Sequence, residues 1–244
     1  MSAQAGGVEF RRIKFAFEAI APGQNVPRHR HLDAYATIVI EGAYEQSSYA
    51  GRLRVGAGDV LVQPTLDCHA NAMLSRGVRL LRLPWPRDSG LGGVYRVEAV
   101  DAILAAAAVD IGVASALLVA AVARASRIAP KIERIGDLLA VDIAGDPDLR
   151  IGEWAECVGV ARESATRSFS RSFGVSPARF GAELKARAAW LRATESCERL
   201  CEVAAGAGFC DQAHMTRAVK RLTGDTPASW RRSLREPELA AATR

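Results

Sequence analysis

The sequence has no hydrophobic run long enough to cross a membrane. Its most apolar stretch, Ile111 to Ala123, has 13 residues, whereas a membrane-spanning helix needs about 20. Met1 to Phe17 contains no apolar run of the kind that a secretion signal requires. Cysteine is also scarce: there are 5 in 244 residues, an odd number, which favours reduced thiols over a disulfide framework. We therefore expect a cytoplasmic protein that does not contact a membrane.

The composition is that of a globular chain with one large domain or two ordinary ones. Hydrophobic residues make up 49% and charged residues 24%, which excludes disordered, collagen-like and disulfide-scaffold proteins. The net charge is +5, and the excess is concentrated near the C-terminus, where residues 149–235 contain 15 basic and 9 acidic side chains. This basic part favours a polyanionic partner.

The chain changes character near residue 96. Before it, short β-branched or alternating runs such as 35–40 and 78–83 are separated by turn signals such as GAGD at 56–59. Several short strands at this spacing predict a sandwich or barrel. From Glu98 onward the sequence becomes rich in Ala and Leu with helical spacing, and no strand signal returns.

The C-terminal part contains the same unit twice, over 149–177 and 200–227. Each copy has a short amphipathic helix, a glycine turn, a second helix with basic positions and a closing Gly-x-[Ser/Thr]-Pro, and the turn glycines Gly159 and Gly208 are 49 residues apart. This is the helix-turn-helix pattern, whose second helix enters the major groove of DNA. The stretch 178–194 predicts a connecting helix of roughly 18 residues, which would be about 27 Å long. Such a rod would hold two recognition helices near the ~34 Å spacing of successive major grooves.

We predict that polar side chains near the start of each second helix contact DNA. Arginine can pair with guanine and glutamine with adenine in the major groove, whereas Arg171, Lys220 and Arg221 are placed to contact phosphates. The other predicted contacts are Arg162, Glu163, Ser164, Thr166, Arg167, Gln212, His214, Thr216 and Arg217. The alternative for any one of them is a solvated helix face. The apolar positions of the same units are predicted core: Trp154, Phe169, Phe173, Phe209, Met215 and Val219.

The second copy closely resembles the signature of AraC/XylS-type transcription regulators. The matching run is Gly208-Phe209-x-Asp211-Gln212-x-His214-x-Thr216-Arg217, then Lys220-Arg221-x-x-Gly224-x-Thr226-Pro227-x-x-Trp230-Arg231. The resemblance covers about 132–232 and implies two helix-turn-helix units on a linker helix that bind promoter DNA. It also implies a small-molecule effector, a homodimer and, for an activator, RNA polymerase as a partner. Arg150 and Ala161 depart from it, since the family usually has Ser or Thr caps there, worth roughly 1 kcal/mol each.

The N-terminal part resembles the two cupin motifs. Gly23 is followed by His29-Arg-His31, Tyr35 and Gly42, and a second segment has Gly58, Pro64 and His69. The resemblance implies a cupin-like β-barrel with an effector pocket at His29, His31, Tyr35 and His69. It maps the family's metal ligands onto His29, His31 and His69, and three imidazoles could hold Zn or Fe. Tyr35 replaces the usual Glu ligand, Leu66 replaces a glycine and Met73 replaces an asparagine.

Because Tyr35 removes the carboxylate that would balance a divalent metal, we expect no cofactor and a metal-free effector pocket, with a divalent metal as the alternative. The rival function is a cupin metalloenzyme, an oxygenase or isomerase using the three histidines. The missing Glu and the complete DNA-binding half weigh against it, so we expect no enzyme and assign no catalytic residue. Cys197, Cys201, Cys210 and His214 have a zinc-like spacing, but cysteine in a helix behaves as a small apolar residue.

Together these patterns predict a multi-domain α+β protein. Residues 1–95 form a cupin-like sensor domain, 96–129 a helical linker and possible dimerisation segment, 130–236 a double helix-turn-helix DNA-binding domain, and 237–244 a tail. We expect one face of the helices at 98–126 to pack on the barrel. Their other face packs either on a second copy or within the chain. The effector, the operator and the choice between activator and repressor stay open.

Overall fold

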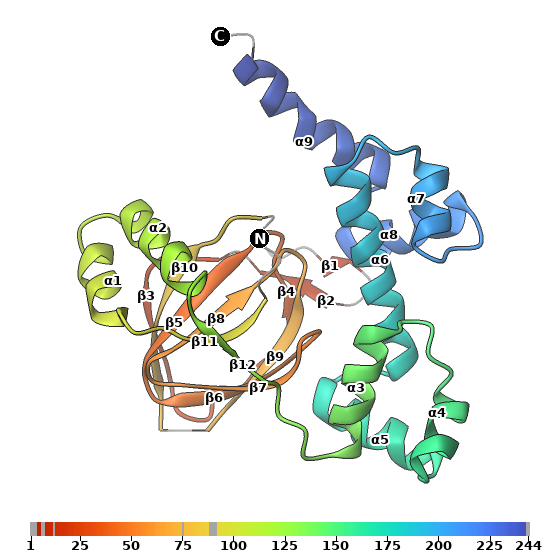
Figure 1. Cartoon of the computed structure of the whole chain (residues 1–244), viewed down its shortest axis with the longest axis horizontal. Helices are drawn as coiled ribbons and strands as arrows, with labels where there is room; N and C mark the ends of the chain where they lie inside the picture. Colours follow the sequence, from red (N-terminus) through yellow and green to blue (C-terminus); the bar gives the residue numbers. More distant parts are fainter. Residues whose placement is uncertain (1–3, 6–7, 12, 75, 88–91, 243–244) are drawn as a thin grey trace.

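The computed structural model describes residues 4–5, 8–11, 13–74, 76–87 and 92–242. A β-rich N-terminal domain and a helical C-terminal domain lie side by side (Figure 1). The first sheet has the order β1 (Gln4–Ala5), β2 (Val8–Phe10), β4 (Val26–Arg30), β9 (Cys68–Met73), β6 (Ala43–Ser48), β7 (Gly51–Gly56). The second has the order β12 (Ser126–Ile128), β11 (Gly93–Arg96), β8 (Asp59–Gln63), β5 (Tyr35–Glu41), β10 (Val78–Pro84), β3 (Phe17–Ile20).

The two sheets face one another across a buried core. Val39 of β5 packs in one cluster with Tyr44 of β6 and Leu53 of β7, so the two sheets share these contacts. The pairs are antiparallel except β2 with β4, which is parallel. Among the described residues the outer strands of one sheet do not pair with those of the other. The predicted cupin-like domain is therefore a two-sheet jelly roll and not one continuous closed sheet.

Two helices, α1 (Val100–Ala107) and α2 (Ile111–Val122), cover the outer face of the second sheet. Ile103 and Leu118 are buried there beside Leu83 of β10, so the prediction that one helix face packs on the β domain is confirmed. The opposite side exposes Val109, Val113 and Leu117.

The expectation that no strand follows Glu98 is wrong. Residues 126–128 form β12, which pairs antiparallel with β11 of the second sheet. Three residues are too few to show a period in the sequence. Here the free backbone edge of β11 decides the conformation, because an edge strand offers unpaired N–H and C=O groups to any nearby segment.

The C-terminal domain contains α3 (Ile135–Gly145), α4 (Ile151–Val158), α5 (Arg162–Phe173), α6 (Pro177–Glu195), α7 (Leu200–Gly206), α8 (Gln212–Thr223) and α9 (Pro227–Ala242). The rod α6, 19 residues long, runs between two groups of helices, α3–α5 and α7–α8 (Figure 1). All six predicted core side chains of these units are buried. Among the described residues, no helix combines the length and the apolar character needed to span a bilayer.

The β domain contributes side chains to the cores of both helical groups. Tyr49 and Cys68 pack in the cluster of α3–α6, and Leu66 packs in the cluster of α6–α9. Leu66 is fully buried and has a φ of 60°, in the left-handed region that favours glycine. The cupin motif has a glycine here; Leu66 adopts a conformation that glycine favours, and its side chain joins the two domains.

Candidate nucleic-acid interface and sensor cavity

Both helix-turn-helix units turn at a glycine in the left-handed conformation. Gly159 has φ 74° and Gly208 has φ 72°, values that cost any residue with a Cβ atom. The second helices then begin after Ala161 and Asp211. Equivalent positions on α5 and α8 are therefore 50 residues apart, one more than the turn glycines, so Arg167 corresponds to Arg217 and Arg171 to Arg221.

The two recognition helices are anchored differently at their starts. Ala161 provides no side-chain cap to α5, and Arg150 provides none to α4, as predicted. At the start of α8, Asp211 Oδ1 accepts a hydrogen bond from the backbone N–H of His214 at 2.6 Å. Since such a cap is worth about 1 kcal/mol, the first turn of α8 is better held than that of α5.

The predicted DNA contacts lie on the outside of the domain. All of them are exposed except Thr166 and Thr216, which are half-buried. A cleft of about 440 Å³ lies between the two units, and it brings together basic residues from both recognition helices. The predicted residues that line it are Arg162, His214, Arg217 and Arg221. Those that do not line it are Glu163, Ser164, Thr166, Arg167, Arg171, Gln212, Thr216 and Lys220.

Most basic side chains of this surface carry a positive charge that no carboxylate compensates. Within the described part of the chain, Arg162, Arg167, Arg217, Lys220 and Arg221 form no ion pair with a carboxylate. Their positive charges therefore remain available for phosphates. His214 differs, because its ring packs edge-on against Phe209 with centroids 5.2 Å apart.

In the β domain the structure brings the three predicted histidines together. His29 and His69 are direct partners across the antiparallel β4–β9 pair, with ring centroids 4.3 Å apart. One ligand atom from each of His29, His31 and His69 lies within 4.8 Å of the others. Tyr35 Oη lies 3.3 Å from His69 Nε2. With Arg82 and other residues, these four line a cavity of about 360 Å³.

Backbone carbonyl groups orient the imidazoles of His29 and His31. His29 Nδ1 lies 2.8 Å from the Pro27 carbonyl, and His31 Nδ1 lies 2.6 Å from the Arg11 carbonyl. Because a carbonyl oxygen only accepts, both Nδ1 atoms carry the proton, which leaves each neutral ring a lone pair on Nε2. Burial lowers the pKa of His31 to about 3 and holds the pKa of His69 well below its ordinary value. His31 and His69 are thus neutral at physiological pH.

The chemistry of this donor set fits a metal such as Zn or Fe, which imidazole nitrogens bind well. His29, His31 and His69 would hold it, and the Nδ1 contacts of His29 and His31 are of the kind that orient metal-bound histidines. No carboxylate takes part, since Tyr35 stands where the cupin motif has Glu. The alternative zinc set fails: among the described residues the three histidines are the one group that could hold a metal, and Cys197, Cys201 and Cys210 are exposed.

Sequence reasoning missed the residues on the other face of β4. Arg28 Nη2 donates to Glu183 Oε2 of α6 at 2.8 Å, and Arg30 Nη1 donates to the Leu222 carbonyl at the end of α8. Tyr49 Oη also donates to Glu183 Oε2, at 3.0 Å. The run Arg-His-Arg-His over 28–31 carried the signal, because alternation in a strand puts the arginines opposite the histidines. Nothing in the sequence identified Glu183 as their partner.

A second buried ion pair joins the domains at α3. Arg52 of β7 donates from Nε to Asp137 Oδ1 at 3.0 Å and from Nη2 to Oδ2 at 2.7 Å. Burial alone would raise the pKa of Asp137. The hydrogen bonds from Arg52 and from the backbone N–H groups of Glu133 and Arg134 outweigh that effect and lower it.

Comparisons agree with the helical geometry. Residues 154–233 match a protein-family model described as a helix-turn-helix domain, and no curated protein matches the chain in sequence. The chain is similar in structure to the C-terminal domain of AraT, a response regulator from Geobacillus stearothermophilus, at 20% identity over 42% of this chain and 88% of that one, with a TM-score of 0.39.

Two further solved structures are similar to this chain. One is ToxT from Vibrio cholerae with bound unsaturated fatty acid, at 10% identity over 90% of this chain and 96% of that one, with a TM-score of 0.40. The other is a salicylate 1,2-dioxygenase variant from Pseudoaminobacter salicylatoxidans, at 20% identity over 27% and 20%, with a TM-score of 0.26. These scores are low, so the assignment rests on the matched domain and its residues. Residues 154–233 are a helix-turn-helix domain, their second unit carries the residues that resemble the AraC/XylS signature, and the chain is a DNA-binding transcription regulator.

Proposed function

We propose that α5 and α8 read two successive major grooves of a promoter, with α6 as the rigid spacer between them. The observation that carries this proposal is the pair of equivalent recognition helices, each with unpaired basic side chains, on one continuous 19-residue rod. At ~1.5 Å per residue the rod is about 28 Å long, close to the ~34 Å groove repeat. Arg162, Arg217 and Arg221 line the cleft between the units, where both helices can approach one face of the duplex.

The test is fluorescence anisotropy with the full chain and DNA from its own promoter. Affinity is expected to fall steeply between low and physiological salt, because lysine and arginine displace counterions from phosphates. Scrambled DNA of the same length and composition is the control, and equal affinity for both DNAs would exclude sequence-specific binding. Dimerisation and contact with RNA polymerase rest on the family resemblance and are further proposals.

We also propose that the histidine cavity takes a small-molecule effector and that β4 conveys its presence to the DNA-binding domain. His29 belongs to the cavity, while its neighbours Arg28 and Arg30 hold Glu183 of α6 and the carbonyl of Leu222 in α8. A ligand that displaces His29 also moves the strand between those arginines. Changing His29, His31 and His69 together to Ala is expected to abolish the effector response in the full chain and leave basal promoter binding in place.

One observation favours a second candidate function. The three clustered imidazoles line a cavity of about 360 Å³, the arrangement that a cupin metalloenzyme needs. Metal analysis of the purified protein discriminates between the two. Stoichiometric iron together with substrate turnover would favour the oxygenase or isomerase, and would leave the DNA-binding domain as a separate activity.

A further inference from the structure

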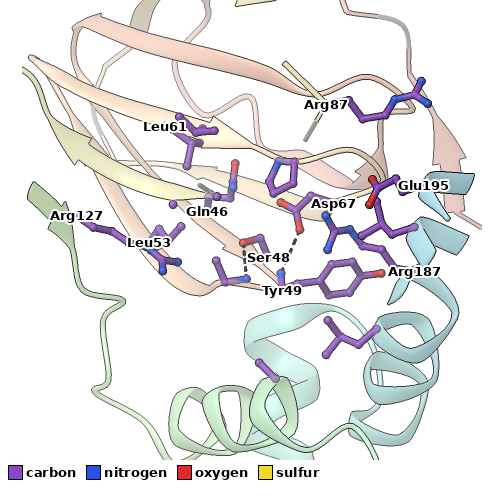
Figure 2. A pocket seen from close by; sticks show the side chains of 18 residues that line it. Gln46, Ser48, Tyr49, Leu53, Leu61, Asp67, Arg87, Arg127, Arg187 and Glu195 are labelled. Atoms are coloured by element: carbon purple, nitrogen blue, oxygen red, sulfur yellow. Dashed lines mark hydrogen bonds between the residues drawn. The ribbon is translucent and has the colours of Figure 1, made fainter. Parts of the chain in front are cut away.

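A second cavity lies between the β domain and the linker helix α6. It has a volume of about 420 Å³ and shares no lining residue with the histidine cavity. Its walls come from both domains, with Gln46, Leu53 and Leu61 from the two sheets and Arg187 and Leu191 from α6 (Figure 2). A molecule bound here would touch the sensor domain and the DNA-binding domain at once.

The cavity has an excess of positive charge. Three arginines line it, Arg87, Arg127 and Arg187, against two acidic residues, Asp67 and Glu195. None of these arginines forms an ion pair with a carboxylate in the described ranges. They come from three separate segments of the chain, and Arg127 and Arg187 stand on opposite sides of the cavity (Figure 2). One negative charge on a ligand would balance the site.

Other contacts fix two of these guanidinium groups at the wall. Arg187 Nε donates to the Thr65 carbonyl at 2.8 Å, so this side chain of α6 is already held against the β domain. Arg87 lies over the ring of Trp190, 5.8 Å from its centroid. A guanidinium group that is held in place loses less freedom when it binds an anion.

Gln46 supplies a second, independent sign of a ligand. Its side chain lines the cavity and is only 1% exposed, yet its Nε2 has no hydrogen-bond partner among the described residues. Its Oε1 is already used, since it accepts from Gln63 Nε2 at 3.2 Å. Buried donors are rarely left unpaired because they have lost water without compensation. An acceptor atom on a ligand would satisfy this amide.

Gln63, the donor to Gln46, connects the two cavities. Gln63 Nε2, which donates to Gln46, also lies 2.8 Å from His69 Nδ1. His69 in turn lines the histidine cavity with Tyr35. A chain of side-chain hydrogen bonds therefore runs from the interdomain cavity through the β domain to the three histidines.

We propose that the interdomain cavity is a binding site for a small organic monoanion with an apolar body. The anionic group pairs with Arg127 or Arg187 and accepts from Gln46, and the apolar body packs against Leu53, Leu61 and Leu191. By contacting both walls, the ligand fastens α6 to the β domain and sets the orientation of the recognition helices. This regulatory part rests on the proposed function, whereas binding itself does not.

The test uses the fluorescent probe anilinonaphthalene sulfonate, an aromatic monoanion, with N-phenylnaphthylamine as its uncharged counterpart. The full-length protein is titrated with each probe. Arg127→Gln and Arg187→Gln are each expected to weaken binding of the sulfonate roughly tenfold, since each removes a charged partner, and to leave the uncharged probe unaffected. Gln46→Leu removes the side-chain amide and tests whether its Nε2 donor contributes to binding of the sulfonate. Arg54→Gln on β7 is the matched control, because Arg54 is exposed and does not line the cavity.

A single sulfonate site per chain that is weakened by Arg127→Gln or Arg187→Gln, but not by Arg54→Gln, supports the proposal. Equal affinity for the two probes, no stoichiometric site in the wild-type chain, or unchanged affinity in both cavity variants overturns it. Thermal unfolding of each variant verifies that it is folded, and exposed Arg127 is the position least able to disturb the fold. Promoter binding without any probe is measured in parallel, so a failure of DNA recognition is seen separately from a failure of the cavity site.

Discussion

His29 and Arg30 are neighbours on β4 and serve opposite faces of the same strand. The His29 ring lies 4.3 Å from the His69 ring inside the histidine cavity. Arg30, by contrast, donates to the carbonyl of Leu222 at the end of α8. The alternation of side chains along a strand imposes this arrangement. A movement of β4 that displaces His29 therefore also displaces Arg30, with no other element between them. The strand directly connects the histidine cavity to a recognition helix.

The orientation of α8 gives a prediction about DNA recognition. Gln212→Ala and Arg217→Ala are expected to weaken binding to the cognate promoter by about 1–3 kcal/mol each and to relax the preference at particular base pairs. Lys220→Ala is expected to weaken binding to all sequences about equally and to make the salt dependence shallower. Anisotropy titrations on promoter and scrambled DNA at several salt concentrations separate the two classes. If both classes of variant behaved alike, α8 would be oriented differently from our assignment.

Leu66 gives a prediction about the contact between the domains. Leu66→Gly relieves the left-handed backbone strain, worth about 1–2 kcal/mol, but removes a fully buried leucine from the cluster around Trp190. Because deleting a large buried side chain costs about 2–5 kcal/mol, the net effect is a loss of roughly 2 kcal/mol. Chemical denaturation measures it. An unchanged or increased free energy of unfolding would mean that this side chain does not join the domains.

The Arg52–Asp137 pair predicts how the docking of α3 depends on pH. The pKa of Asp137 in the folded protein is lowered below its unfolded value. The pair's contribution to stability is therefore fully present above the unfolded value, about 3.9, and is lost as the pH falls through the lower folded value. The protection of the α3 amides, meaning their hydrogen-exchange rate relative to that of an unfolded chain at the same pH, is expected to stay high at pH values above about 4 and to fall below it.

Asp137→Asn is the control for that experiment. The amide keeps a similar shape but cannot pair as a charge with Arg52, so exchange in α3 is expected to be faster at neutral pH and less sensitive to acid. If the wild-type chain and this variant showed the same pH profile, another group would control the docking of α3.

The histidine cluster gives a prediction about metal. Tyr35 supplies no negative charge, and its hydroxyl lies against His69 Nε2, the atom that a metal would need. We therefore expect weak binding, seen as small shifts in thermal unfolding on titration with Zn, Fe and Mn. Tyr35→Glu, which restores the carboxylate of the cupin motif, is expected to strengthen binding. A submicromolar, stoichiometric site in the wild-type chain would contradict the metal-free pocket.

The sequence alone determined those features whose cause is local. The glycines at the two turns, the apolar stripes of the recognition helices and the length of α6 depend on residues close together in the chain. For this reason the double helix-turn-helix and its buried side chains were predictable. The three histidines were also placed correctly, because the alternation of a strand and the spacing of two motifs define them.

The tertiary structure decided what depends on residues distant in the sequence. Glu183 lies 155 positions from Arg28, and Asp137 lies 85 from Arg52, so no local pattern pairs them. Strand β12 formed because an edge of the sheet was free beside it, and Leu66 found its apolar neighbours on α6 and α8. The interdomain cavity lined by Gln46 and Arg187 exists only when the β domain and α6 are packed together. Burial and pairing across domains depend on that packing, which short-range spacing in the sequence does not describe.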